Sequence, residues 1–320
     1  MEKLLAGLID ARKRGTLNRR QFCETVAIAA TVYAAGKHAA NAAPAQGTAP
    51  ARGFRPIAIN HISYACPDYR KARDFYASVL GMAILASADK GRETRLMFGP
   101  EPGKGGSFLL PRNGTMATKA TAIVDHIGYA VSNWDETRIR AALTAKGLAP
   151  AEAHGGGLKI YDPFDYGVPI TAAAPLSSGA KGPSSEPALK VAGVDHISYR
   201  CADVGRAADW YSKIFNLEQI GASPSEVILP FGGKDAAMPR LLIRTRDAGE
   251  QAGQLRRKPK ALVNHIAYTI ADFSKERVRA ELKRLGYPNP LQDGEHSFHI
   301  VDPNGFDVQI SGIAMTALGG

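Results

Sequence analysis

The chain has 320 residues, 45% of them hydrophobic, and a formal net charge of +10, which allows two domains with cores of their own. Residues 1–50 hold seven Lys or Arg against three Asp or Glu, so +4 of the charge lies in this leader. The other basic residues are dispersed except for the run at 256–258, which predicts a solvated loop. No nucleic-acid motif is present, and three cysteines exclude a disulfide framework.

Residues 1–45 predict an export signal. Arg19 and Arg20 precede an apolar run at 26–35, and small residues at 40–42 offer a cleavage site. This arrangement resembles a twin-arginine signal, so the export machinery is an expected partner. The mature protein is expected to be periplasmic or extracytoplasmic, and cytoplasmic if the signal does not function. The apolar run is too short for a stable membrane span.

One short phrase occurs four times and fixes the architecture. Each copy places a histidine at the same point of a strand-like stretch, and histidine is the commonest metal ligand. The copies are Asn60-His61-Ile62-Ser63-Tyr64, Asp125-His126-Ile127-Gly128-Tyr129, Asp195-His196-Ile197-Ser198-Tyr199 and Asn264-His265-Ile266-Ala267-Tyr268.

Longer matches join the first copy to the third and the second copy to the fourth. Each copy opens an alternating strand, which an amphipathic helix and three short strand-like runs follow. We therefore predict an α+β fold of two domains, each with two paired βαβββ modules. The predicted domains are residues 57–175 and 191–313, with a linker at 176–190 that is rich in Gly, Pro and Ser.

The strand alternation also predicts which side chains face which way. Ile62, Tyr64 and Cys66 share one face, and His61 lies on the other. We expect the apolar face to pack on the following helix, which Asp68 should cap. Cys66 and its counterpart Cys201 are then buried, inert thiols, and the histidines point to the opposite face.

The repeat and its closing phrase resemble the vicinal oxygen chelate superfamily, which includes glyoxalases, bleomycin-resistance proteins and extradiol dioxygenases. The closing phrase runs from Asp302 to Ile310 and reads Asp-Pro-Asn-Gly-Phe-Asp-Val-Gln-Ile. The resemblance covers residues 57–175 and 191–313, and the two-domain arrangement is most similar to that of the extradiol dioxygenases.

The resemblance implies a divalent metal site in the C-terminal domain, formed by His196, His265 and Gln309. The family usually has Glu where this chain has Gln309. Two imidazoles and an amide leave the ion its full charge, so this site should favour a small anionic substrate that chelates the metal. The resemblance leaves the metal open among iron, manganese, zinc and nickel.

The N-terminal domain should be structural. His61 and His126 are present, but Pro169 stands at the position of the third ligand and offers no side-chain donor. We expect the two histidines to be hydrogen-bonded residues that remain from a duplication.

Three kinds of residue complete the candidate site. His299 alternates with Phe298 and Ile300, so it is the candidate general acid or base, or else a polar lining residue. Arg200 and Ser198 share a face with His196, and Arg244 lies on a neighbouring strand-like run; these three are candidate substrate-binding residues. Surface ion pairs are the alternative for both arginines.

The resemblance therefore predicts a metal-dependent enzyme of the glyoxalase or dioxygenase type. Redox-active iron or manganese would favour oxygen chemistry, whereas zinc or nickel would favour lyase or isomerase chemistry. The alternative is a metal-free protein that binds or sequesters a small molecule, as bleomycin-resistance proteins do, and a third is an exported scaffold with a vestigial site. The sequence leaves a homodimer open.

Overall fold

The computed structural model describes residues 54–85, 91–99, 106–114, 121–173, 180–231, 239–246 and 260–312. The expected export signal and the basic run at 256–258 lie outside these residues. In the described part of the chain, no helix is long and apolar enough to cross a membrane.

The N-terminal half, residues 54–173, contains two βαβββ modules in one sheet. Their strands, with the short β9 that follows, lie in the order β6-β7-β8-β5-β1-β4-β3-β2-β9. The elements are β1 (Pro56–Cys66), α3 (Tyr69–Leu80), β2 (Ala83–Leu85), β3 (Arg95–Phe98), β4 (Ser107–Asn113), β5 (Ile123–Val131), α4 (Glu136–Ala145), β6 (Ala151–Glu152), β7 (Leu158–Tyr161), β8 (Gly167–Thr171) and β9 (Ala180–Lys181).

The C-terminal half, residues 191–312, repeats this plan in a second sheet, in the order β11-β12-β10-β13-β16-β15-β14. An isolated bridge between Ile220 and Ile228 stands where its first module would have a short strand. The elements are β10 (Val191–Cys201), α5 (Val204–Phe215), β11 (Glu226–Pro230), β12 (Arg240–Thr245), β13 (Leu262–Ile270), α6 (Lys275–Arg284), β14 (Leu291–Asp293), β15 (Ser297–Val301) and β16 (Asp307–Ser311). The fold is thus the mixed α+β architecture that the repeat predicts.

The helices begin where the sequence predicts. The Asp68 carboxylate accepts hydrogen bonds from the backbone N–H groups of Arg70 and Lys71, and α3 ends at Gly81, whose φ is +69°. Asp203 caps α5 in the same way. Cys66 and Cys201 are buried free thiols. Burial raises the pKa of each thiol to about 12, so neither is a reactive thiolate near neutral pH.

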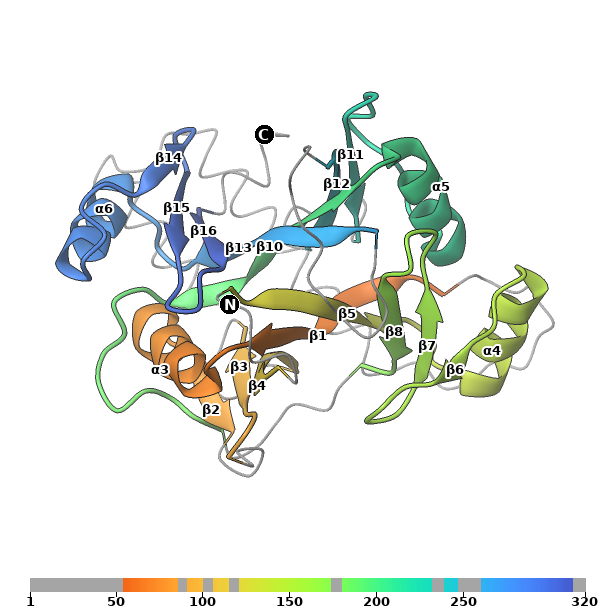
Figure 1. The fold of residues 1–320 in the computed structure, drawn as a ribbon, viewed down its shortest axis with the longest axis horizontal. Helices are drawn as coiled ribbons and strands as arrows, with labels where there is room; N and C mark the ends of the chain where they lie inside the picture. The colour runs from red at the N-terminus through yellow and green to blue at the C-terminus, as the bar shows by residue number, and fades with distance from the viewer. Residues whose placement is uncertain are drawn as a thin grey trace, which may run out of the picture. The chain divides into compact units, whose positions relative to one another are not determined.

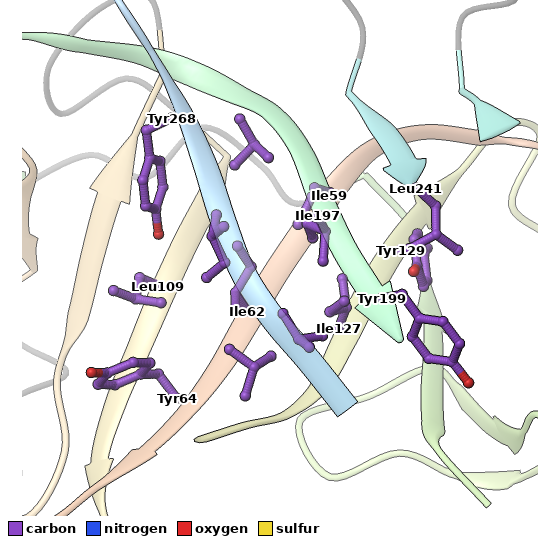
Figure 2. Close-up of a cluster of buried hydrophobic side chains, with 14 of the residues drawn as sticks. Ile59, Ile62, Tyr64, Leu109, Ile127, Tyr129, Ile197, Tyr199, Leu241 and Tyr268 are labelled. Atoms are coloured by element: carbon purple, nitrogen blue, oxygen red, sulfur yellow. The ribbon is translucent and has the colours of Figure 1, made fainter. Parts of the chain in front are cut away.

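The apolar faces of the two sheets turn toward each other, and helices alone do not cover them. Figure 2 shows Ile62, Ile127 and Ile197 between the crossing strands of the two halves. Ring contacts also cross between the halves: Tyr76 of α3 lies 6.2 Å from Tyr268 of β13, between ring centroids. The two halves therefore share one buried core (Figure 1).

A buried aspartate joins the end of the C-terminal half to the first strand and helix of the N-terminal half. One oxygen of Asp302, Oδ1, accepts backbone hydrogen bonds from Asn304 and Phe306, at 2.8 and 3.0 Å, and shapes the turn before β16. The other oxygen, Oδ2, accepts the hydroxyl hydrogens of Tyr64 and of Tyr76, the latter at 3.0 Å. The pKa of Asp302 is raised because burial outweighs these hydrogen bonds.

The symmetry-related aspartate makes the reciprocal connection. Asp162 binds the backbone N–H groups of Phe164 and Tyr166 through Oδ1 and accepts from Tyr199 and Tyr211 of the C-terminal half through Oδ2. Each half thus supplies two tyrosines to the turn of the other. We refer to these two networks as the tyrosine–aspartate clasps.

Candidate metal and substrate site

All four histidines of the repeat follow an Asn or Asp that sits at an irregularity of the strand. The register of β1 with β5 skips Asn60 and Asp125, and that of β10 with β13 skips Asp195 and Asn264. In a regular strand these residues would point away from the histidines that follow them. A bulge re-aims the side chain, so each reaches its own histidine.

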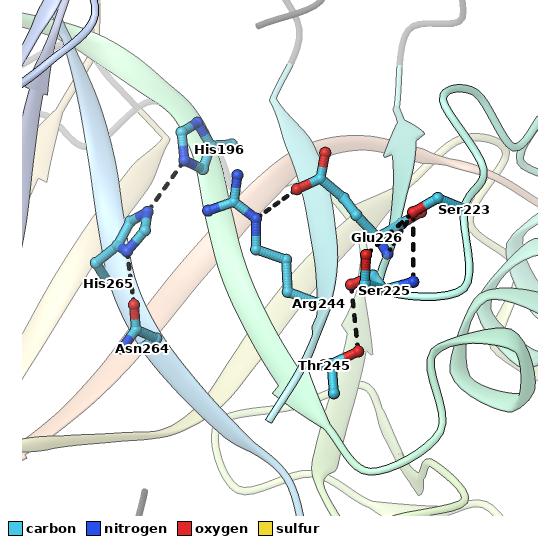
Figure 3. A network of polar contacts seen from close by, with 8 residues as sticks. All are labelled: His196, Ser223, Ser225, Glu226, Arg244, Thr245, Asn264 and His265. Carbon is cyan, nitrogen blue, oxygen red and sulfur yellow. Dashed lines mark hydrogen bonds and ion pairs between the residues drawn. The ribbon is translucent and has the colours of Figure 1, made fainter. Parts of the chain in front are cut away.

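The C-terminal pair converges closely (Figure 3). Nε2 of His196 lies 3.2 Å from Nε2 of His265. Asp195 Oδ2 is 2.6 Å from Nδ1 of His196, and Asn264 Oδ1 is 2.8 Å from Nδ1 of His265. Because both oxygens accept hydrogen bonds, both Nδ1 atoms donate, and the neutral rings carry their lone pairs on Nε2.

Two lone pairs that face each other at 3.2 Å repel unless a positive species lies between them. Two metal–nitrogen bonds of about 2.0–2.1 Å, meeting near a tetrahedral angle, span roughly 3.3 Å. The spacing therefore fits two ligands of one metal ion. The pKa of His265 is lowered to about 2, first by burial and then by His196 and His299. The neutral form thus predominates, as metal binding requires.

Strands β15 and β16 add further donors to this face of the sheet, which we call the polar face. In the parallel register, His265 pairs with Asp307 and Ala267 pairs with Gln309, so Asp307 and Gln309 share the side of His265. The amide nitrogen of Gln309 donates to Ser297 Oγ at 3.0 Å. This bond fixes the orientation of the buried amide and turns its oxygen to the other side.

His299 is paired with a carboxylate that the sequence analysis did not single out. His299 pairs with Gln309 across β15 and β16, and its Nδ1 lies 2.9 Å from Oδ1 of Asp307. Its ring meets that of His265 edge-on, with centroids 4.9 Å apart. Ligand atoms of His265, His299 and Asp307 also lie within 4.8 Å of one another. However, Nδ1 of His265 is already hydrogen-bonded to Asn264. A metal ion would therefore bind Nε2 of His265, which faces His196, more readily than Nδ1.

The candidate substrate-binding residues lie on the polar face beside the histidine pair. Ser198 pairs with His265, and Arg200 with Arg244. The Nε of Arg244 donates to Glu226 at 2.6 Å, so Arg244 is already in an ion pair (Figure 3). The positive charges of Arg244 and Arg200 lower the pKa of His265 further, which places them in its electrostatic environment.

The N-terminal half contains the same histidine pair in different surroundings. Nε2 of His61 lies 3.1 Å from Nε2 of His126. The positions of Asp307 and Gln309 are taken by Gly167 and Pro169, and Lys159 pairs with Pro169 as His299 pairs with Gln309. The pKa of His61 is lowered to about 3 by burial and by His126, and Lys159 contributes to this.

Lys159 lies against the position where a carboxylate would have to stand. A Cβ added to Gly167 would come within 2.9 Å of its Cε and 3.2 Å of its Nζ. Neither residue 167 nor residue 169 has a side-chain oxygen, and Lys159 fills the space where one would stand, so this pair lacks a third ligand.

The sequence contains signals for some site residues that were not predicted from it. The Asn or Asp before each histidine was visible in the repeated phrase and supplies the Nδ1 partner. Asp307 lies two positions before Gln309, so strand alternation places it on the same face. No local signal marks Arg240 of β12, because only the strand register places it beside His196.

Comparisons with known proteins agree with this architecture. The family model of the Glyoxalase/Bleomycin resistance protein/Dioxygenase superfamily matches residues 58–168. No curated protein sequence matches the chain. Among solved structures, the fold is similar to the Mn(II)-bound glyoxalase from Novosphingobium aromaticivorans, with 15% identity, a TM-score of 0.58, and coverage of 81% of this chain and 83% of the other.

Two dioxygenases are comparably similar. For homoprotocatechuate 2,3-dioxygenase from Arthrobacter globiformis the identity is 14%, the TM-score is 0.59, and 82% of each chain is covered. For the 2,3-dioxygenase LapB from Pseudomonas sp. KL28 the identity is 13%, the TM-score is 0.61, and 80% of this chain and 92% of that chain are covered. Residues 58–168 therefore match the glyoxalase, bleomycin resistance protein and dioxygenase superfamily, and both halves of the chain have its fold.

Proposed function

We propose that the C-terminal half is the active half of a metal-dependent enzyme of the glyoxalase or dioxygenase type, which acts on a small oxyanionic substrate. His196 and His265 would bind the metal through Nε2, and Gln309 would be the third protein ligand. One observation carries the proposal: two Nε2 atoms face each other at 3.2 Å beside an amide and a carboxylate, whereas the same pair in the N-terminal half faces a lysine.

The residues around the histidine pair would position the ligands, as their contacts support. Asp195 and Asn264 hold the two imidazoles in the tautomer that presents Nε2. Ser297 holds the Gln309 amide. A bound divalent ion would supply a Lewis acid that polarises substrate oxygens.

His299 is the residue placed to move a proton. The Asp307 carboxylate accepts a hydrogen bond from its Nδ1, so the lone pair of the neutral ring lies on Nε2. The edge-on contact with His265 brings His299 close to whatever the histidine pair holds. A carboxylate that orients an imidazole in this way also stabilises its protonated form. We therefore assign the acid–base role to His299 and the orienting role to Asp307.

Metal content tests the proposal. Protein purified without a histidine tag should contain about one equivalent of a divalent metal, or bind one equivalent of added Mn(II), as measured by elemental analysis and calorimetry. His196→Ala and His265→Ala should abolish this binding. The matched control is His61→Ala, which removes the equivalent imidazole of the N-terminal half and should leave the metal content unchanged.

Two outcomes would count against the assignment. Equal loss of metal from His61→Ala and His265→Ala would show that the site is wrongly placed. Absence of metal binding by the wild-type protein would mean that a shared proton, and not a metal ion, separates the imidazoles. That result would favour the metal-free binding protein.

A further inference from the structure

We propose that Arg240 and Ser198 form an anion subsite on the polar face, which takes a carboxylate or phosphate group of the ligand beside the histidine pair. The assignment of this anion to the substrate rests on the proposed function. The existence of the subsite is independent of that function. The observation behind it is that Ser63 of the N-terminal half has a protein partner, whereas Ser198 at the same position, and Arg240 beside it, have buried polar atoms without a partner among the described residues.

Arg240 is placed next to the histidine pair by the strand register. In the parallel pairing of β10 with β12, Arg240 lies directly beside His196, and both side chains point to the polar face. Leu241 and Ile243, the alternate residues, belong to the core. Arg240 is only 9% exposed, and its Nη2 has no hydrogen-bond partner among the residues that the structure describes.

Ser198 is the second unsatisfied group. It is fully buried, and within the described ranges its hydroxyl has no hydrogen-bond partner. The register sets it between His265 on one side and Leu242 on the other, so it is the diagonal neighbour of Arg240. In the described part of the chain, Nη2 of Arg240 and the hydroxyl of Ser198 therefore stand beside the histidine pair without an acceptor. An oxyanion supplies such an acceptor.

The N-terminal half shows how the protein satisfies these positions when no ligand is needed. Ser63, the counterpart of Ser198, accepts a hydrogen bond from Nε of Arg112 at 3.1 Å, and Arg112 also pairs with Asp125. The pKa of Asp125 is lowered to about 2: burial would raise it, but the hydrogen bond from His126 and the charges of His126 and Arg112 outweigh burial. Ser63, Arg112 and Asp125 are thus joined to one another or to His126, although Oδ1 of Asp125 has no hydrogen-bond partner among the described residues.

In the C-terminal half each of these contacts is replaced. Arg244, the counterpart of Arg112, turns to Glu226 and leaves Ser198 without it. Asn264 stands where the N-terminal half has Asp125, and Asp195 stands where it has Asn60, so the carboxylate lies on the other strand and is bound to His196. The counterpart of Arg240 is Phe108, whose ring stacks on His61 with centroids 5.4 Å apart. A phenyl ring thus covers the N-terminal histidine pair, whereas a guanidinium group lies beside the C-terminal pair.

A protein carboxylate does not fill this role. Asp195 is the nearest acidic residue along β10, but its Oδ2 is bound to His196, and no ion pair joins Asp195 to Arg240 in the described part of the chain. A buried guanidinium nitrogen without a hydrogen-bond partner is costly. Nη2 of Arg240 has none among the residues that the structure describes, which points to a ligand that pairs with it. Together with the ion, the subsite would select substrates that carry two chelating oxygens and a separate anionic group.

The first test needs no metal. The thermal unfolding midpoint of EDTA-treated protein is measured against increasing acetate and, separately, inorganic phosphate, at constant ionic strength. Wild type should show saturable stabilisation, and whichever anion binds more tightly identifies the group. Since a hydrogen bond to a charged group is worth about tenfold or more in affinity, Arg240→Met and Ser198→Ala should weaken the apparent binding by about that factor.

The controls separate anion recognition from general charge and folding effects. Arg95→Met removes the same charge from an exposed arginine of the N-terminal half and should keep the wild-type response. Arg240→Met should fold with an unfolding midpoint in chloride at least equal to that of wild type, because it removes an unpaired buried charge. No saturable stabilisation of wild type by either anion, or an unchanged response in Arg240→Met, would refute the subsite.

The second test asks whether the anion belongs to the substrate. Mn(II)-loaded protein is titrated with catechol and with 3,4-dihydroxybenzoate, two chelating diols that differ by a carboxylate. We expect the carboxylate to improve affinity about tenfold in wild type and not in Arg240→Met. No preference in wild type would overturn the link to the substrate, whereas failure to bind Mn(II) at all would instead overturn the proposed function.

Discussion

Replacing Tyr64 by Phe removes one hydroxyl from a tyrosine–aspartate clasp. Tyr64 is fully buried, and its hydroxyl donates to Oδ2 of Asp302. A hydrogen bond to a charged group contributes about 1.5–3 kcal/mol. Tyr76 and two backbone donors still bind the carboxylate, so we expect a loss of about 2 kcal/mol in the free energy of unfolding. In a unit of this size that corresponds to a fall of roughly 4–8 °C in the unfolding midpoint.

The repeat provides a matched control in Tyr268. This tyrosine occupies the same place in the fourth copy of the phrase and is equally buried, but in the described part of the chain its hydroxyl has no hydrogen-bond partner. Tyr268→Phe should therefore be neutral or stabilising in the same calorimetric or denaturant experiment. If Tyr268→Phe and Tyr64→Phe destabilise equally, packing and not the hydrogen bond holds the two halves together, and the reasoning is wrong.

The clasp also predicts a pH dependence. Burial raises the folded-state pKa of Asp302 above its unfolded value, so the ionised carboxylate costs folding free energy at high pH. This cost disappears as the pH falls through the folded pKa toward the unfolded value. Wild type should gain stability relative to Asp302→Asn over that range, in denaturant titrations at decreasing pH. Asp125, whose pKa is lowered, should show the reverse: its stabilisation is lost as the pH falls toward about 2.

Three further predictions concern the metal site and the leader. Gln309→Glu adds a negative charge beside the histidine pair, so metal binding should tighten and binding of an anionic chelator should weaken; tighter binding of both would contradict the site. Replacing Lys159 by His, Gly167 by Asp and Pro169 by Gln gives the N-terminal pair the three donors that surround the C-terminal pair, and elemental analysis should then show a second equivalent of metal, which no single change gives. Arg19→Lys combined with Arg20→Lys should trap full-length protein in the cytoplasm in a fractionation experiment; unchanged localisation would exclude the twin-arginine route.

Much of the fold could be predicted because the determinants are local. Alternation in the repeated phrase correctly separates Ile62 from His61, and Asp68 and Gly81 correctly mark the ends of α3. The prediction that a helix covers the apolar face is incomplete, since the other sheet covers it as well. Nothing in a single strand's pattern says which surface lies opposite it.

The candidate site was harder to predict from the sequence, because several of its contacts depend on which strands pair. The convergence of His196 and His265 follows from repetition, and it was expected. Whether Arg244 is available to a ligand depends on Glu226, which is brought to it by the pairing of β11 with β12. The importance of Arg240 depends on a register that only the assembled sheet reveals. Roles that depend on long-range pairing cannot be read from local spacing.

The clasps make each half necessary for the stability of the other. Without residues 57–175, Asp302 would lose both tyrosine donors, and Tyr199 and Tyr211 would lose their carboxylate acceptor. The apolar face of the second sheet would also be exposed to solvent, because the two halves share one buried core. A shortened gene that encodes only the C-terminal half would therefore specify a chain with an exposed hydrophobic face and without the hydrogen bonds of either clasp. The exchange of tyrosines between the copies thus ties the persistence of each copy to the stability of the other.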